Sequence, residues 1–200
     1  MVRLAISVEG PTEERFVHKI IEPHLVIRRI YAIPLLLGSA GGDVSLPRIK
    51  KDLNHIARSF DKVTTLYDFY GFRGKESEES KETLEQKILD SVAAPLRDRV
   101  IPYVQMYEFE GLLFSSPEAI ENTIQHNGLS AWAKEILDEF DGDPEKINDS
   151  VHTAPSKRLL KKTDYIKTVH GPDIAQEIGL GGLREKCSGF DAWMSQLEEL

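Results

Sequence analysis

Cysteine is nearly absent from this chain of 200 residues, in which Cys187 stands alone. One cysteine excludes an intrachain disulfide and a cysteine-rich zinc site, and it fits a reducing, cytoplasmic compartment. The simplest role for Cys187 is that of a small buried apolar residue. Stability must therefore come from packing, and a chain of this length with 40% hydrophobic residues can bury a full core as one domain.

Long apolar runs, internal repeats and low-complexity segments are also missing. No run approaches the roughly 18 apolar residues that a membrane helix needs, and no basic segment with a signal-type apolar stretch opens the chain. We therefore expect a cytoplasmic protein without a membrane partner. The loop at residues 38–43 contains glycines but no Walker pattern, so the chain is not expected to hydrolyse ATP itself.

Positive charge is in short supply. The 25 Lys and Arg residues are outnumbered by 33 Asp and Glu residues, which gives a net charge of -8. This balance argues against a general nucleic-acid coat, although it does not exclude a nuclease. A polyanionic partner would have to meet a local basic patch or a bound metal.

Apolar segments that alternate with helical patterns predict an α/β fold. Strand-like runs occupy residues 2–8, 31–37, 61–67 and 99–107. Strands alternating with helices indicate a mostly parallel central sheet flanked by helices. From residue 117 onward the pattern is mostly helical, which predicts one domain over residues 1–200 with an α/β core (1–116) and a C-terminal helical lobe (117–200).

Local signals refine the helix boundaries. Thr12 is expected to cap the first helix, and Pro23 is expected to close or bend it after Glu22. The second helix should begin near Pro47. The turn at residues 141–144 is the expected internal seam.

Acidic residues stand just past the ends of three predicted strands: Glu9, Asp68, and the pair Glu108 and Glu110. In an open α/β sheet the carboxyl ends of the strands border the ligand crevice, so these carboxylates can converge on one divalent cation. The alternative is that each acid only caps a helix. Extended spacing puts Glu108 and Glu110 on one face, whereas helical spacing points them apart.

A basic cluster offers the second component of a phosphodiester site. Lys157 and Arg158, with Lys161 and Lys162, lie in a segment that Ser156 is expected to cap. Lysine and arginine near a helix N-terminus suit phosphate binding, so we predict this role for Lys157 and Arg158. The alternative is a solvated helix face.

Three aromatic residues and one histidine have simpler roles. Trp132, Phe190 and Trp193 are expected in the core, with base stacking as the alternative. His170 is expected to be structural or exposed, although histidine can also protonate a leaving oxygen.

The segment Val-Glu-Gly-Pro-Thr-Glu-Glu at residues 8–14, followed by Asp-Phe-Tyr-Gly at 68–71, resembles the toprim pattern. The whole chain is similar to one toprim-like bacterial family of unknown function, often found beside ATPases in defence gene clusters. Its further matching segments are residues 107–114, 154–159, 165–167, 178–180 and 187–193. The family is related to the toprim domains of overcoming-lysogenization-defect nucleases.

This resemblance implies a toprim-like fold and a site in which acidic residues hold Mg²⁺, with Mn²⁺ as a substitute. Glu9 matches the first-strand glutamate and Asp68 the first aspartate, but Tyr70 stands where the pattern has its second aspartate. We hypothesise that Glu108 or Glu110 supplies the missing ligand. The expected metal ligands are thus Glu9, Asp68, Glu108 and Glu110, and the expected catalytic residues are Glu9, Asp68 and Glu110.

Two functions remain open. The first is a Mg²⁺-dependent nuclease or phosphoesterase acting on nucleic acid, DNA or RNA, as the effector of an ATPase-gated anti-phage defence module. The second is a noncatalytic toprim-scaffold subunit that binds a partner ATPase. Tyr70 favours the second function, whereas Glu9, Asp68 and Glu110 together favour the first.

Overall fold

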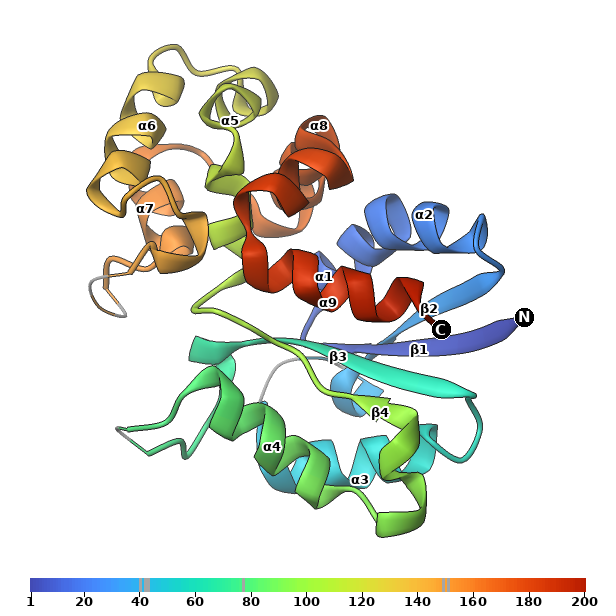
Figure 1. The fold of residues 1–200 in the computed structure, drawn as a ribbon. Coiled ribbons are helices and arrows are strands. Elements are labelled where there is room, and N and C mark those ends of the chain that lie inside the picture. The colour runs from blue at the N-terminus through green and yellow to red at the C-terminus, as the bar shows by residue number, and fades with distance from the viewer. Residues whose placement is uncertain (40, 42–43, 77, 149, 151) are drawn as a thin grey trace.

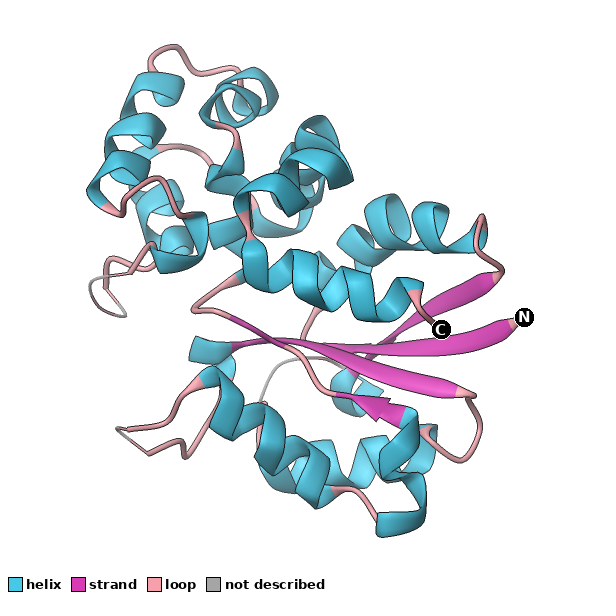
Figure 2. Ribbon diagram, in the orientation of Figure 1, coloured by secondary structure: helices cyan, strands magenta, loops and turns pink. Residues whose placement is uncertain are grey.

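A parallel sheet between two layers of helices forms the centre of the protein (Figure 1). The computed structural model describes residues 1–39, 41, 44–76, 78–148, 150 and 152–200. Much of the loop predicted at residues 38–43 lies outside the described residues. Figure 2 shows helices on both faces of the sheet, and this confirms the predicted α/β class.

The sheet has the strand order β2-β1-β3-β4, and β5 also pairs with β3. The strands are β1 (Val2–Val8), β2 (Ile30–Leu36), β3 (Lys62–Asp68), β4 (Val100–Ile101) and β5 (Val104–Gln105). All of the pairings are parallel. Val8 lies opposite Leu36 on one side and Leu66 on the other, so the carboxyl ends of the three long strands form one edge.

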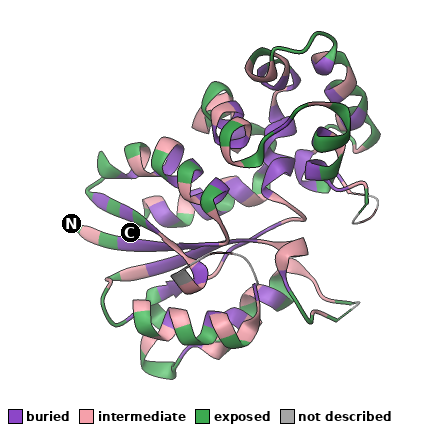
Figure 3. Cartoon of the chain, turned by 180° about the vertical axis from the view of Figure 1, so that it is seen from behind, coloured by how far each residue is buried: buried purple, intermediate pink, exposed green. Residues whose placement is uncertain are grey.

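Both faces of the sheet are covered, which explains why β1 reads as a continuous apolar run. Leu4 and Ile6 belong to the core on one face, and Ala5 belongs to the core on the other. The second face packs on α3 (Leu46–Ile56) and α4 (Lys81–Ser91). β1, β3 and the inner sides of the helices are mostly buried, whereas the outer helix sides are exposed, and β2 alternates between buried and exposed residues (Figure 3).

The first face is covered by helices from both ends of the chain (Figure 1). They are α1 (Pro11–Phe16), the π-helical turn η1 (Val17–Ile21), α2 (Glu22–Val26) and α9 (Ser188–Glu198), and α8 (Lys167–Lys186) packs on α1 and η1. The indole of Trp193 in α9 stacks on Tyr103 with ring centroids 4.5 Å apart, and its Nε1 donates a hydrogen bond of 2.8 Å to Thr64 Oγ1. These contacts hold α9 against the sheet.

The remaining helices gather beyond one end of the sheet (Figure 1). They are η5 (Phe109–Ser115), α5 (Pro117–Ile124), α6 (Leu129–Glu139) and α7 (Pro155–Lys162). Short helical turns connect the larger elements: η2 (Leu37–Ser39), η3 (Phe69–Gly71), η4 (Ala94–Arg99) and η6 (Pro144–Lys146). None of the helices in the described part of the chain has both the length and the apolar character needed to span a bilayer.

The single strand predicted over residues 99–107 is wrong, because the chain forms β4 and β5 with a break between them. Pro102 has no N–H to donate there. The backbone groups of Tyr103 bond to a side chain instead: its N–H donates to Thr65 Oγ1 and its carbonyl accepts from that hydroxyl, each at 2.8 Å. The Thr65 hydroxyl thus takes the place of the backbone hydrogen bonds between strands at Tyr103.

The predicted cap of the first helix is wrong, and Pro23, which was predicted to close or bend that helix, does not close it. Gly10, rather than Thr12, is the N-cap, and Thr12 lies inside the helix as a buried residue. Pro23 does not close the helix, which continues to Val26. The π-helical turn ends just before Pro23 and places it in the first turn of α2, where a missing N–H is tolerated.

Candidate functional site

The carboxyl ends of β1 and β3 bring Glu9 and Asp68 together, as the sequence predicts. The backbone N–H of Asp68 points to Glu9 Oε2 at 3.4 Å. Burial raises the pKa of Glu9, and nearby Glu110 adds to this effect. A carboxyl with a raised pKa holds its proton more readily unless a cation arrives.

Gly71 gives the Glu9 carboxylate its space. A Cβ atom at Gly71 would lie 2.3 Å from Glu9 Oε2, so any larger residue displaces that carboxylate.

We expect Gly71→Ala to weaken Mn²⁺ binding by about tenfold or more, measured by calorimetric titration, with folding checked by circular dichroism. Gly181→Ala is the control, because nothing lies within 4 Å of a Cβ there. Equal Mn²⁺ affinity in the two variants would contradict this role for Gly71.

Asp68 connects the end of β3 to η5. Its Oδ1 accepts a hydrogen bond of 2.7 Å from the backbone N–H of Phe109. Burial raises the pKa of Asp68 well above its usual range, and the negative charges of Glu9 and Glu13 raise it further. Without a cation the site therefore favours the protonated form of Asp68, whereas a bound cation would favour the charged form.

The two glutamates after β5 have different partners. Tyr107 has φ of 58°, and η5 begins directly after Glu108. Oε2 of Glu108 accepts a hydrogen bond of 2.8 Å from the backbone N–H of Ser156 at the start of α7. Glu110 is only 2% exposed and lies with its Oε1 3.1 Å from Lys167 Nζ. Glu108 thus caps α7, and Glu110 belongs to the buried acidic cluster.

Lys167 is a site residue for which the sequence analysis predicted no role. It opens α8, and that helix packs so closely on α1 that a Cβ at Gly171 would lie 3.4 Å from a Thr12 methyl carbon. Burial alone lowers the pKa of Lys167, but Glu110 and Glu108 outweigh burial and raise it. Lys167 therefore remains a cation beside the carboxylates.

Glu13 is a second residue that sequence reasoning missed. It lies in α1, is 8% exposed, and has its pKa raised to about 8, mainly by burial and also by Glu9 and Glu110. The signal was its position four residues after Glu9, in the first turn of a helix that directly follows a strand. We define the acidic cluster as Glu9, Glu13, Asp68 and Glu110.

Tyr70 supplies no carboxylate. Its hydroxyl donates a hydrogen bond to Asn148 Oδ1, and its ring lies 5.4 Å from that of Tyr107. The residue that stands where the second aspartate was expected is therefore hydrogen-bonded to the loop that precedes α7. Glu13 and Glu110 are the further acids whose charges act on Asp68.

The donor set fits a hard cation by its chemistry. The acidic cluster offers oxygen atoms, and the pKa of each of its carboxyls is raised. Ser156, next to Glu108, has a buried hydroxyl that finds no hydrogen-bond partner among the described residues. Within the described ranges, however, no three His, Cys, Asp or Glu side chains are already placed to hold a metal ion. The metal ligands therefore remain a prediction, because the carboxylate oxygens would have to move closer together to bind one cation.

The basic residues of α7 lie apart from this cluster. Arg158 Nε donates a hydrogen bond of 2.7 Å to the carbonyl of Thr153, and its guanidinium lies 5.6 Å from the Phe140 ring centre. Lys157 and Arg158 line a separate pocket between α6 and α7. The expected Ser156 cap is wrong, since Ala154 is the N-cap and the serine hydroxyl is buried.

His170 and the aromatic residues have mostly structural surroundings. Nδ1 of His170 accepts a hydrogen bond of 3.0 Å from the backbone N–H of Ile166 at the start of α8. Phe190 and Trp193 are buried, whereas Trp132 is half-buried and packs at the edge of the core.

Two solved structures are similar to this chain over nearly its whole length. The C-terminal region of the Burkholderia pseudomallei OLD protein matches with a TM-score of 0.52 at 15% identity, covering 99% of this chain and 99% of that chain. The C-terminal region of the Xanthomonas campestris pv. campestris OLD protein matches with a TM-score of 0.42 at 14% identity, covering 98% of this chain and 95% of that chain. No curated protein matches the sequence.

A family model described as "Domain of unknown function (DUF4276)" matches residues 8–198. The match spans almost the whole chain and includes every residue of the acidic cluster. The expected likeness to a toprim-like family of unknown function is thereby confirmed. The chain belongs to the DUF4276 family and has the fold of the C-terminal region of an OLD protein.

Proposed function

We propose that the protein is a metal-dependent nuclease or related phosphodiesterase. The observation that carries this proposal is the acidic cluster: four carboxyls with raised pKa lie at the carboxyl edge of a parallel sheet. Such an edge is where open α/β sheets bind ligands. Clustered carboxyl oxygen atoms suit Mg²⁺, or Mn²⁺ in its place, because a bound cation favours the charged form of each carboxyl.

Glu9, Asp68 and Glu110 are the proposed ligands, and Glu108 stands next to them. The bound ion would polarise a phosphoryl oxygen and lower the pKa of an attacking water. Lys167 adds a fixed positive charge 3.1 Å from Glu110, where it can contact a phosphate oxygen. Glu13, whose pKa is raised to about 8 by burial, can hold or release a proton near neutral pH.

The biological setting follows from the family resemblance. We propose that the protein acts in the cytoplasm as the effector of an anti-phage defence module gated by a partner ATPase. The lack of a Walker pattern in its own sequence supports a separate source of ATPase activity.

A cleavage assay tests the catalytic proposal. Supercoiled DNA, single-stranded DNA and tRNA are incubated with the protein and Mg²⁺ or Mn²⁺, with and without the neighbouring ATPase. We expect Glu9→Gln and Asp68→Asn each to reduce cleavage by more than about 100-fold, because each removes a charged metal ligand while keeping the side-chain shape.

Asp98→Asn is the matched control. Asp98 is exposed and precedes β4, so it lies at the amino end of a strand rather than at the carboxyl edge. Cleavage that survives both Glu9→Gln and Asp68→Asn would contradict the proposed site.

The alternative function is a noncatalytic subunit that binds the partner ATPase. Two observations favour it: Tyr70 bonds to Asn148 where an acidic ligand was expected, and Lys167 already neutralises part of Glu110. If cleavage is absent under every condition while a stable complex with the ATPase forms, this alternative replaces the nuclease.

A further inference from the structure

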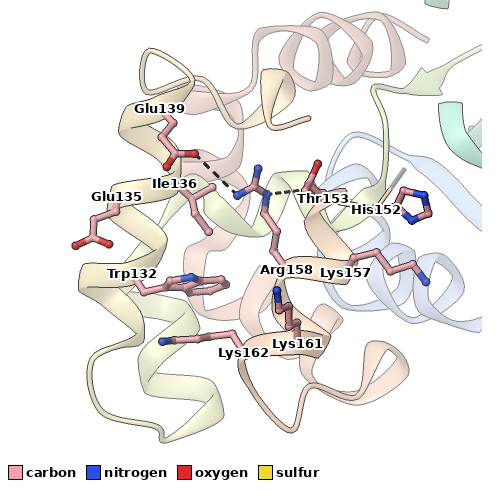
Figure 4. Close-up of a pocket in the computed structure, with 10 residues that line it drawn as sticks. All are labelled: Trp132, Glu135, Ile136, Glu139, His152, Thr153, Lys157, Arg158, Lys161 and Lys162. Atoms are coloured by element: carbon pink, nitrogen blue, oxygen red, sulfur yellow. Dashed lines mark hydrogen bonds and ion pairs between the residues drawn. The ribbon is translucent and has the colours of Figure 1, made fainter. Parts of the chain in front are cut away.

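A pocket of about 400 Å³ lies between α6 and α7, outside the acidic cluster. Figure 4 shows Trp132 on the α6 side, with Arg158, Lys161 and Lys162 on the α7 side. A cavity of this size takes a small-molecule or single-residue ligand. None of the residues that line the pocket belongs to the acidic cluster.

The pocket is basic on balance in an acidic protein, because four Lys and Arg residues line it together with two acids, Glu135 and Glu139. α7 carries Lys157, Arg158, Lys161 and Lys162 and no acidic residue, in a chain with a net charge of -8. Arg158 is held by the Thr153 carbonyl and by Glu139 at 4.0 Å. In the part of the chain that the structure describes, the three lysines are exposed and no ion pair to them is found. They are available to a phosphate.

Trp132 gives the pocket an aromatic surface. The indole packs on Phe114 with ring centres 6.0 Å apart, yet it remains half-buried and lines the cavity. An aromatic surface next to lysines is the combination on which a base stacks while its phosphate is held. Lys161 and Lys162 extend from α7 on the same side as the ring, whereas Lys157 extends toward His152 (Figure 4).

α7 runs between the pocket and Glu108, whose charge acts on Glu9 and Glu110 of the acidic cluster. Its first turn bonds to Glu108 through the backbone N–H of Ser156, and Lys161 and Lys162 stand at its other end. An α-helix rises about 1.5 Å per residue, so this helix spans only about 10 Å. A polynucleotide bound at the pocket can therefore reach the acidic cluster within a few nucleotides.

We propose that this pocket binds one nucleotide of a single-stranded nucleic acid, with its base on Trp132 and its phosphates on Lys161 and Lys162. The chain then runs along α7 toward the acidic cluster. The inference rests on the proposed function and gives it a substrate class. A duplex is excluded from this contact, since its bases are paired and stacked and cannot reach a half-buried indole.

Intrinsic fluorescence tests the proposal without catalysis. The protein has two tryptophans, of which Trp193 is 2% exposed, so a bound base quenches Trp132 selectively. A short oligothymidylate is titrated into the full chain in EDTA. We expect quenching that Trp132→Phe abolishes, and about tenfold weaker binding by anisotropy for Trp132→Ala, which removes the stacking ring.

The two lysines provide a second test of the proposal. We expect the double variant Lys161→Ala and Lys162→Ala to bind about tenfold more weakly at low salt, with a salt slope reduced by about 1.4, or 0.7 for each lost phosphate contact. The double variant Lys50→Ala and Lys51→Ala is the control, because it removes two adjacent exposed lysines from α3 on the other face of the sheet.

The outcomes separate this inference from the proposed function. Quenching that depends on Trp132 and the lysine pair supports the inference even if added Mg²⁺ brings no cleavage. Wild-type cleavage with unchanged affinity in both variants overturns the inference and leaves the nuclease proposal intact. The inference also fails if oligothymidylate does not bind, if a duplex quenches Trp132 equally well, or if only an acidic peptide does so.

Discussion

Raising the pH from 5 to 8 in the absence of divalent metal is expected to lower the free energy of unfolding by as much as about 4 kcal/mol. The main reason is Glu13, whose pKa burial raises to about 8 in the folded protein. The folded state then binds more protons than the unfolded chain, in which a glutamate titrates near 4.3. The stabilising contribution is complete below the unfolded pKa and is lost as the pH rises through the folded pKa.

Glu9, Asp68 and Glu110 act in the same direction, because burial raises the pKa of each carboxyl. Urea denaturation in EDTA at a series of pH values measures the effect, and Glu13→Gln should flatten the curve. Glu14→Gln, one position further along α1 and less buried, is the matched control. Adding Mn²⁺ at pH 8 should restore part of the stability, since a ligand that binds only the folded state stabilises it.

A wild-type stability that stays level or rises over this pH range would contradict the burial of protonated Glu13. A slope that persists unchanged in Glu13→Gln would instead assign the pH dependence to another group.

Trp193→Ala is expected to destabilise the protein by about 3 to 5 kcal/mol. The substitution removes the largest fully buried side chain, the stack on Tyr103 and the hydrogen bond to Thr64 together. Chemical denaturation followed by far-ultraviolet circular dichroism measures the loss. The expected result is a lower midpoint with a single cooperative transition.

Trp193→Phe separates the contributions. Phenylalanine keeps an aromatic ring against Tyr103 and loses the indole N–H, so about 1 kcal/mol should be lost through the Thr64 contact. Thr64 Oγ1 still donates to the carbonyl of Ile101 at 2.6 Å. Leu160→Ala serves as the control, because Leu160 is 45% exposed. A change of less than 1 kcal/mol for Trp193→Ala would mean that α9 is not fixed through this residue.

Much of the fold could be predicted because the chain is locally consistent. Residues 2–8 form β1 with the predicted bounds, and β2 and β3 are each displaced by one residue. The break in the fourth strand was signalled by Pro102, but its exact form depends on the Thr65 side chain, which lies far from Tyr103 in sequence. The π-helical turn before Pro23 leaves no clear mark in the apolar pattern either.

The candidate site was predictable where residues follow strands. Glu9 and Asp68 were found by this rule, and the parallel register brings them together. Glu13 and Lys167 lie on helices, and only tertiary packing turns them toward the sheet edge. The choice between Glu108 and Glu110 depended on the turn at Tyr107 and on the position of α7, which no local pattern encodes.

The bond between Trp193 and Thr64 joins residues 129 positions apart. Such a contact closes a long loop, and the entropy lost in closing it delays its formation. The sheet can therefore assemble from β1, β2 and β3 while the face that α9 covers is still open. During folding, that apolar face is the surface most exposed to association with other chains.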